Sequence, residues 1–338
     1  MKETLASISE RIGVSAATIS RVINGKAQQY RISPETVELV LAEVQRCNYT
    51  PSVLAQSLRT NKTSTIGLIL PSVSNPFFAT LADSIISAAN AKGYTTIVVD
   101  NRDNEANQQA CISTLLSRKV DGIIAAPCGD DPSLFEEINR TSVPVVLVDR
   151  YFEESNISFV TSNNYKGAFD AAELLVRNGH RHIACIQGDP ESLPNKRRVS
   201  GFLAALGKHG LEENAVVAGD SFSIQNGYLE TKLLLNLNPA PTAIFALSYT
   251  ILLGVIKALQ DSNLSIPEDM SVISFDENLC LDYMTPPMTR VSQPVEEMGK
   301  LACKLLFGSI ESKTRKSSKL ELVTQLKVGK SVKLQHAI

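Results

Sequence analysis

The stretch that decides the fold of this chain is GVSAATISRVING, residues 13–25. Gly13 can adopt the positive φ of a tight turn, and the hydroxyl of Ser15 can cap a helix that begins after it. In that helix Ile19, Val22 and Ile23 fall on one face and can pack inward. The outward face consists of Ala16, Ala17, Thr18, Ser20, Arg21 and Asn24. Such a face can lie in a DNA major groove, because small side chains permit close approach while Arg and Asn donate hydrogen bonds.

Two more helices are expected around this one. The spacing of Leu5, Ile8 and Ile12 predicts a helix over residues 4–12. Ser33 and Pro34 supply the cap and the first-turn proline of a third helix. Its expected buried stripe is Val37, Val40, Leu41 and Val44. The motif alone also fits an ordinary helical hairpin with a solvated face, but three short helices around one small core are typical of a DNA-binding headpiece.

The bulk composition describes a globular chain long enough for two or three domains, with 338 residues and a net charge of −2. Residues 1–62 hold eight basic and five acidic residues, whereas the remainder holds 25 and 30. A basic head on an acidic body fits phosphate contact at one end. No apolar run could span a bilayer and no signal peptide is evident, so a cytoplasmic protein without membrane association is expected. The six cysteines form no Cys-x-x-Cys pair, which predicts buried free thiols.

Residues 51–62 separate the head from the rest of the chain. Pro51 ends the preceding helix, and Ser52 can cap a new helix of only two turns. In that helix Leu54 and Leu58 share one face. So short a helix is not stable alone, and the segment also fits a plain linker.

From residue 65 the pattern changes to apolar strands alternating with amphipathic helices. Strands are expected at 65–70, 96–99, 122–126, 144–148, 182–186, 215–218, 242–247 and 270–275. Helices are expected at 77–92, 105–118, 166–178, 196–209, 225–235, 251–262 and 295–307, with strand-like segments at 319–325 and near the C-terminus. Continuous apolar strands between helices predict doubly wound parallel sheets, and the length suits two of them in series. The expected fold is thus an α/β core of two lobes behind an all-α headpiece.

With these parts in order, the chain resembles the LacI/GalR family of transcription regulators over essentially its full length. The resemblance rests on residues 13–25, on Tyr49, Pro51, Ala55, Ser57, Leu58, Arg59 and Thr60, on 66–71 with 75–78, on Gly179, His180, Ile183 and Ala184, and on Ile273, Phe275 and Asp276. It implies a headpiece (1–50), a hinge helix (51–62) and a core like a periplasmic sugar-binding protein. The two lobes of that core would be 63–162 with about 292–320, and 163–291 with about 321–338.

The resemblance also implies how DNA is bound. Ala16 and Ala17 take the positions that choose the operator half-site, and Arg21 is a further base or phosphate contact. Paired hinge helices of a homodimer, including Ala55 and Leu58, enter the minor groove, where Leu58 wedges into a base step. The segment 26–33 is longer than the family's usual turn, and Tyr30 and Arg31 in it are candidates for phosphate contacts.

Doubly wound sheets bind ligands beyond the carboxyl ends of their strands, and polar or aromatic residues follow several strands here. The resemblance makes ten of them the effector-binding positions: Ser72, Asn75, Phe77, Phe78, Asp149, Arg150, Arg198, Phe222, Ser248 and Asp276. Carboxylates and Arg forks orient sugar hydroxyls or acids, and aromatic rings stack on sugar faces. An Asp at a strand end also fits a helix cap, and Phe77 and Phe78 also fit the core.

Two features of the sequence bear on the chemical class of the effector. Ser248 and Tyr249 stand where the family commonly has Asn-Asp, so a carboxylate is missing. Lys196, Arg197 and Arg198 are expected near the cleft, with Arg150 opposite, although Lys196 and Arg197 also fit the solvated start of a helix. Fewer acids and more bases favour an anionic effector, such as a sugar acid or a sugar phosphate, over a neutral sugar. Induction and corepression would use the same cleft, but the bound effector would lower the operator affinity in the first case and raise it in the second.

The same residues bear on other functional classes. An enzyme would need a catalytic motif, and the chain has no nucleophile elbow, Walker loop or dinucleotide-binding glycine motif; no cofactor or metal is expected. A solute-binding protein without a regulatory role would need export and no headpiece. A catabolite-control-type regulator that responds to a phosphorylated carrier protein remains an alternative. The favoured function is a sequence-specific, DNA-binding repressor controlled by a small molecule.

Overall fold

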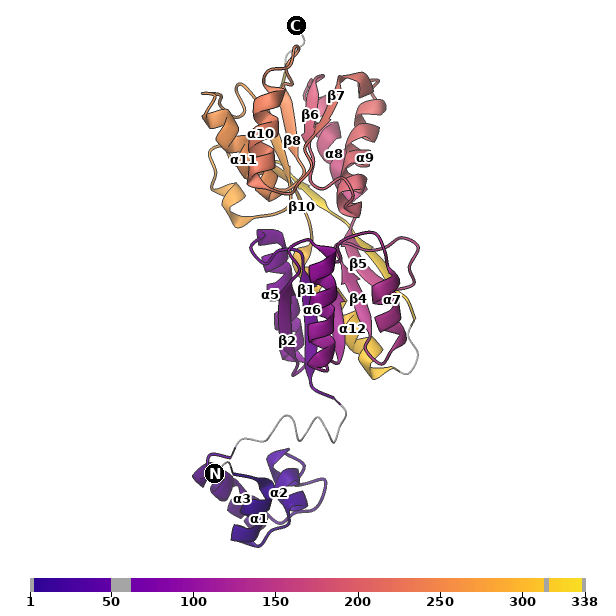
Figure 1. Ribbon diagram of the computed structural model, residues 1–338. Helices are drawn as coiled ribbons and strands as arrows, with labels where there is room; N and C mark the ends of the chain where they lie inside the picture. The colour runs from indigo at the N-terminus through magenta and orange to yellow at the C-terminus, as the bar shows by residue number, and fades with distance from the viewer. Residues whose placement is uncertain (1–2, 50–61, 313–315, 336–338) are drawn as a thin grey trace. The chain divides into compact units, whose positions relative to one another are not determined.

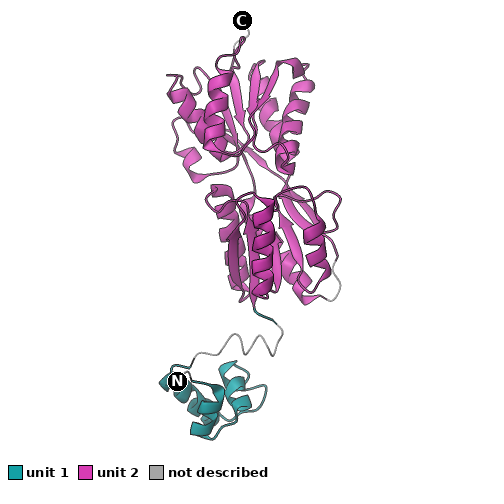
Figure 2. Ribbon diagram, viewed as in Figure 1, with its two compact units in different colours: residues 1–63 teal, residues 64–338 magenta. Residues whose placement is uncertain are grey.

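The computed structural model describes residues 3–49, 62–312 and 316–335. The chain divides into two compact units, residues 1–63 and 64–338 (Figure 2). No helix in these described ranges is long and apolar enough to cross a membrane.

The first unit is a three-helix headpiece, built from α1 (Leu5–Ile12), α2 (Ala16–Ile23) and α3 (Pro34–Arg46). A hydroxyl caps each helix, and Gly13 ends α1 with a φ of 68°. The core consists of Ile8, Ile19, Val22 and Val40, with partly buried neighbours. The prediction that Leu41 is buried was wrong, since 49% of it is exposed. Only a narrow stripe of α3 faces so small a core, and Leu41 lies one helical step, about 100°, from Val40.

The second unit contains two α/β lobes, each around a six-stranded sheet, with helices on both faces of each sheet (Figure 1). The first sheet has the order β11-β5-β4-β3-β1-β2, and all its pairs are parallel. Its strands are β1 (Thr65–Leu70), β2 (Thr95–Asp100), β3 (Gly122–Ala125), β4 (Val145–Val148), β5 (Ser158–Ser162) and β11 (Lys319–Leu322). Its helices are α5 (Pro76–Ala91), α6 (Glu105–Ser117), α7 (Ser133–Arg140) and α12 (Val295–Glu311).

The second sheet repeats this topology in the order β12-β10-β9-β8-β6-β7, with only β12 antiparallel to its neighbour. Its strands are β6 (Ile183–Ile186), β7 (Ala215–Ala218), β8 (Ala243–Ala246), β9 (Ser271–Phe275), β10 (Thr289–Ser292) and β12 (Gln325–Lys327). Its helices are α8 (Asn164–Arg177), α9 (Leu193–Gly207), α10 (Ile224–Leu234) and α11 (Tyr249–Gln260), with short 3-10 turns η1 (Glu212–Asn214) and η2 (Leu279–Asp282). The chain passes between the lobes after β5, after β10 and after β11.

The predicted fold class is confirmed, but besides the two short 3-10 turns, three elements were not foreseen from the sequence. These are the helix α7 and the strands β5 and β10. The strand sequences SFVTS and TRVS are short and rich in hydroxyls, so they lack the apolar run that marked the other strands. Both strands are nevertheless buried at every position, because neighbouring strands and helices cover them.

The core of each lobe lies in two layers, one on each face of its sheet. Along β1, Leu68 packs with α5 and α12 while Ile69 packs with α6 and α7, as the alternation of a strand requires. All six cysteines are free, as expected, but Cys47 and Cys111 are only partly buried and Cys280 is exposed. Cys280 departs furthest from the prediction of buried thiols. It lies in the surface turn η2, where no second layer covers it.

Candidate functional site

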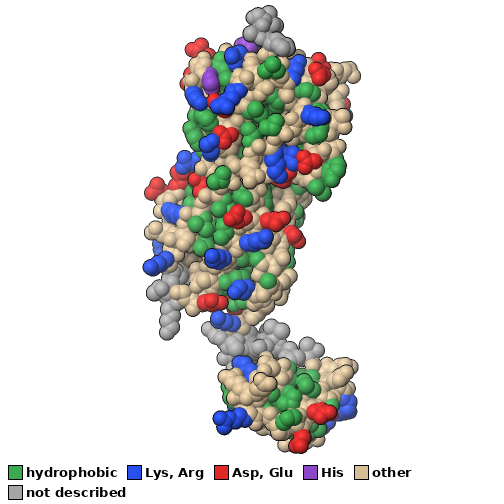
Figure 3. All heavy atoms as spheres, turned by 180° about the vertical axis from the view of Figure 1, so that it is seen from behind, with side chains coloured by type: hydrophobic (Ala, Val, Ile, Leu, Met, Phe, Trp, Pro, Cys, Tyr) green, Lys and Arg blue, Asp and Glu red, His purple; other side chains and the backbone are tan. Residues whose placement is uncertain are grey.

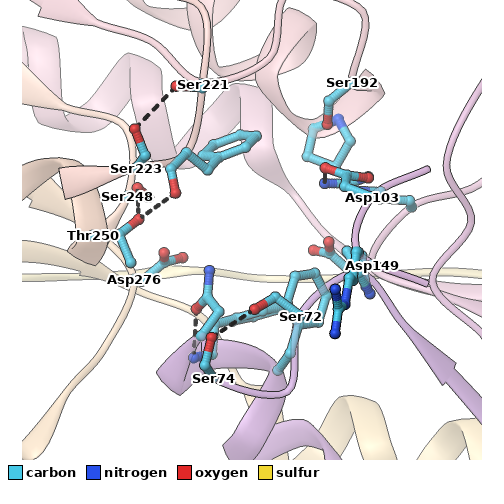
Figure 4. A pocket seen from close by; sticks show the side chains of 18 of the residues that line it. Ser72, Ser74, Asp103, Asp149, Ser192, Ser221, Ser223, Ser248, Thr250 and Asp276 are labelled. Atoms are coloured by element: carbon cyan, nitrogen blue, oxygen red, sulfur yellow. Dashed lines mark hydrogen bonds and ion pairs between the residues drawn. The ribbon is translucent and has the colours of Figure 1, made fainter. Parts of the chain in front are cut away.

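A pocket of about 610 Å³ lies between the two lobes of the second unit (Figure 4). It is formed where strands end and where α5, α9, α10 and α11 begin. Helix N-termini present free N–H groups, so this arrangement favours oxygen-rich ligands. All ten residues that the sequence nominated for the effector line it: Ser72, Asn75, Phe77, Phe78, Asp149, Arg150, Arg198, Phe222, Ser248 and Asp276.

Sequence reasoning missed several further lining residues. They include Asp100, Arg102, Asp103, Ser192, Ser221, Ser223 and Thr250. Asp100 ends β2, so the strand-end rule could have found it. Asp103 lies in a loop in which Arg102 and Asp103 itself have left-handed backbone conformations. No local sequence pattern predicts that this loop reaches the pocket.

Two aspartates face the pocket from opposite lobes (Figure 4). Asp149 follows β4 and Asp276 follows β9, the third strand in each sheet order. Both have left-handed backbones, with φ of 65° and 80°. Such a conformation is costly for a residue other than glycine and is often found at functional sites. The fold therefore places an equivalent strained carboxylate on each wall.

The two carboxylates differ in their partners. Asp276 accepts hydrogen bonds from Gln293 Nε2 at 2.6 Å and from the Tyr249 N–H at 3.3 Å. The Oδ1 atom of Asp149 is buried and accepts no hydrogen bond within the described part of the chain. Burial raises the pKa of Asp149 to about 6, although Arg198 and Arg150 partly oppose this rise. Strand β5 follows Asp149, and Asn278 caps the turn η2 that follows Asp276, so neither aspartate caps the next element in the chain. Asp276 instead accepts from the first N–H of α11, which lies earlier in the chain.

Arg198, in the second turn of α9, is 4% exposed and is held from several sides. Its Nε donates to Asn164 Oδ1 and its Nη1 to the Leu247 carbonyl, both at 2.7 Å. Its Nη2 lies 3.9 Å from Asp276 Oδ1. The guanidinium also lies 3.8 Å from the ring centre of Phe275, a cation–π contact. This fixes Arg198 as a rigid donor at the pocket floor.

The remaining basic residues do not match the expected cluster. Lys196 and Arg197 do not line the pocket; they are exposed and paired with Glu191 and Glu153. Both point away from the pocket, because along a helix Arg197 is turned by about 100° from Arg198 and Lys196 by about 200°. Arg150 does line the pocket, and both ends of its fork are paired with the Asp103 carboxylate.

The aromatic residues of the pocket serve two purposes. Phe77 and Phe78 are each 6% exposed and belong to the core of the first lobe, yet both also line the pocket. Their rings meet edge to face with centres 5.1 Å apart. The Phe222 ring lies against Gly188, where an added Cβ would come within 2.3 Å of it. These rings give the pocket apolar surfaces between its polar groups.

The outward face of α2 carries the predicted DNA-binding residues. Ser15, Ala17, Arg21 and Asn24 are exposed, and Ala16, Thr18 and Ser20 are partly buried. Ser15 caps the helix through the Thr18 N–H, and the Asn24 amide donates to the Ser20 carbonyl at 2.6 Å. Ala55 and Leu58 lie outside the described residues. On the visible face of the second unit, basic and acidic side chains are interspersed (Figure 3), a mixture that attracts a phosphate backbone only weakly.

The strained, buried Asp149 is expected to cost stability, and Asp149→Asn should recover it. Because the folded pKa of about 6 lies above the ordinary 3.8, the folded state retains the proton longer, and stability falls as pH rises from about 4 to 6. The variant should be more stable than the parent at pH 7, by at most about 3 kcal/mol. Urea unfolding at pH 4, 5, 6 and 7 measures this. A constant difference across those pH values would contradict it.

The chain shares a DNA-binding headpiece and a bilobal pocket with a class of effector-controlled DNA-binding proteins. Residues 4–52 match the model of bacterial regulatory proteins, lacI family, and residues 172–332 match the periplasmic binding protein-like domain. Catabolite control protein A of Priestia megaterium is 32% identical over 98% of this chain and 100% of its own length. The transcriptional repressor PurR of Erwinia tasmaniensis is 34% identical over 97% and 96%.

Solved structures agree with these matches. The lac repressor dimer bound to operator and the anti-inducer ONPF superimposes with a TM-score of 0.88, at 26% identity over 98% of this chain and 100% of that one. A LacI family regulator from Enterococcus faecium with bound ribose gives 0.74, at 27% identity over 80% and 100%. This chain belongs to the lacI family of bacterial transcription regulators. It is a DNA-binding repressor under effector control, not an enzyme.

Proposed function

We propose that the pocket between the lobes binds a small polyhydroxylated effector, a sugar or a sugar derivative, which sets the affinity of the headpiece for its operator. The observation that carries this proposal is the pair of buried aspartates, one on each lobe, beside the fixed donor Arg198. A sugar hydroxyl can donate to a carboxylate and accept from a guanidinium at once. A ligand held by both lobes would fix the angle between them.

The charges of the pocket favour a neutral sugar over an anion. Four aspartates line it, against three arginines. Arg150 and Arg198 are already engaged with Asp103 and with Asn164, Leu247 and Asp276. The helix N-termini still give a sugar acid or phosphate some attraction, so anionic sugars form the second arm of the test. The ribose and anti-inducer complexes of related regulators support a sugar-sized ligand.

The experiment is a thermal-shift screen of the full chain against neutral sugars, sugar acids and sugar phosphates. A ligand that binds only the folded state raises the melting temperature with its concentration. A hit should be lost in Asp276→Ala. Adding that hit to an operator-binding assay gives the sign of the coupling, induction or corepression. If no compound raised the melting temperature, the sugar proposal would be contradicted. The alternative, a phosphorylated carrier protein bound on the core surface, would then be favoured. The similarity to catabolite control protein A is the reason for considering this alternative.

For DNA recognition, we propose a homodimer that presents two copies of α2 to a near-palindromic operator. The similar lac repressor structure is a dimer on its operator. On this chain, Leu279 and Tyr283 in and after η2 are 74% and 80% exposed, a large apolar surface for a water-facing turn. We assign this turn to the dimer contact.

Tyr283→Asp is accordingly expected to shift the protein from dimer to monomer, because it buries a charge in an apolar interface. Sedimentation velocity at micromolar concentration measures the change. Val328→Asp is the matched control, since Val328 is 68% exposed on the same lobe but lies after β12. Two variants that sediment alike would remove the assignment of this turn.

A further inference from the structure

The loop between α2 and α3, which is longer than is usual in the family, is an ordered loop that packs on the headpiece core. It follows α2 and spans residues 26–33. Ala27 and Ile32 are partly buried against the headpiece core. The Ile32 N–H donates to the Ala27 carbonyl at 3.0 Å, and the Tyr30 N–H donates to the Lys26 carbonyl at 3.2 Å. These bonds hold Tyr30 outward, with 47% of it exposed.

Tyr30 touches a residue of the DNA-facing helix. The guanidinium carbon of Arg21 lies 4.1 Å from the centre of the Tyr30 ring. The start of the loop is tied to the same residue, because the Lys26 N–H donates to the Arg21 carbonyl at 2.9 Å. The Arg21 guanidinium donates no hydrogen bond and forms no ion pair to any residue that the structure describes. Among the described residues, the Tyr30 ring is therefore the group that restricts the position of the Arg21 guanidinium.

The geometry of the contact leaves Arg21 able to bind DNA. All five N–H donors of a guanidinium lie in its plane, so a ring against its face occupies none of them. A long arginine side chain otherwise loses rotamer freedom when it binds a base edge. A ring that holds the side chain beforehand reduces this loss, as preorganisation generally does.

We propose that Tyr30 is a positioning residue that stacks on Arg21 and directs its in-plane donors toward the operator, as in bidentate contact with a guanine O6 and N7. The inference rests on the proposed role of Arg21 in DNA recognition. It assigns the long loop a function in specificity: the loop supplies the ring, and α2 supplies the donors. Tyr30 itself touches the arginine rather than the base.

The test uses the full chain and a double-stranded DNA site selected from a random library by the unaltered protein. Affinity at fixed salt is compared for Tyr30→Phe, Tyr30→Leu, Arg21→Ala and the double variant. Gln29→Ala, an exposed neighbour in the same loop, is the control for a general loop effect. Melting temperatures of all variants establish that the headpiece remains folded.

Tyr30→Phe keeps the ring and should bind like the parent. Tyr30→Leu should bind about twofold to fivefold more weakly per headpiece, the factor that corresponds to about 0.5–1 kcal/mol for an exposed cation–π contact. In the Arg21→Ala background it should cause no further loss. A new selection with Tyr30→Leu should relax the preference at the same base pairs as Arg21→Ala does.

Four outcomes would overturn the inference. Tyr30→Leu binding as tightly as the parent would mean that the stack has no role. Equal losses in both backgrounds would mean that Tyr30 acts independently of Arg21, and a loss in Tyr30→Phe would point to its hydroxyl on a phosphate. If Arg21→Ala bound normally, the proposed role of Arg21 would fail too. Only that last result contradicts the role of Arg21 in DNA recognition, whereas the other three contradict only the positioning role of Tyr30. The failure of one hypothesis can therefore be told from the failure of the other.

Discussion

Arg198→Met is expected to lower the free energy of unfolding of the second unit by about 3–5 kcal/mol and to abolish effector binding. The guanidinium is buried and satisfies Asn164, the Leu247 carbonyl and the face of Phe275. Methionine fills much of the same volume but offers no charge and no donor. Its presence would leave the nearby carboxylates without their compensating cation, and the unsatisfied polar groups add to that cost.

Urea unfolding of the full chain, followed by circular dichroism, measures this loss, and calorimetry with the hit from the sugar screen measures binding. Arg197→Met is the matched control, one residue along the same helix. Its side chain is half exposed and interacts with Glu153 and Tyr151 at the surface, so its change in stability should stay within about 0.5 kcal/mol. Equal effects of the two substitutions would show that the buried network is not what stabilises this lobe.

Gly254→Ala is expected to destabilise the second unit by about 3 kcal/mol or more, above the usual range for an overpacked site. Helices α10 and α11 approach so closely that a Cβ on Gly254 would lie 2.1 Å from the Ile224 carbonyl oxygen and 2.5 Å from the Tyr228 nitrogen. Gly227 makes the reciprocal approach to Ile251. The obstructing atoms are backbone, so relief requires the two helices to separate. Ile224 lines the pocket, so effector affinity should fall as well.

Gly308→Ala supplies the control, because it makes the same chemical change inside the helix α12. Apart from its chain neighbours and the nearby backbone of its own helix, a Cβ there meets no described atom within 4 Å. Alanine also favours a helix over glycine by roughly 0.5–1 kcal/mol. This variant should be slightly more stable than the parent in the same unfolding measurement. A neutral Gly254→Ala would show that α10 and α11 are free to move apart.

The fold class followed from the sequence because its signals are local. The caps at Ser15 and Ser33, the positive φ of Gly13 and the alternation of apolar strands with helices each depend on residues only a few positions apart. The strands β5 and β10 were not predicted because part of their burial comes from strands later in the chain. β5 pairs with β11 as well as with β4, and β10 pairs with β12 as well as with β9.

The pocket, like the fold, was predicted from the sequence only in part. The strand-end rule, joined to the family resemblance, nominated ten residues that the structure brings into one pocket. The grouping of Lys196 and Arg197 with Arg198 near the cleft was wrong, whereas the alternative of a solvated helix start agrees with their exposure. Composition near a cleft does not say which side of α9 faces inward. Sequence reasoning also missed Asp103, whose pairing with Arg150 changes the charge balance and hence the effector that the pocket favours.

By itself, then, the sequence determined the headpiece, the two-lobed α/β core and the strand ends that carry the site, because helix and strand periodicity, caps and turns are set by neighbouring residues. Only the tertiary structure decided which charges are paired, which carboxylate oxygen accepts no hydrogen bond from the described residues, and which aromatic ring contacts Arg21. Those properties depend on distances of a few ångströms between residues remote in the chain, where burial and pairing together set the energy of a charge.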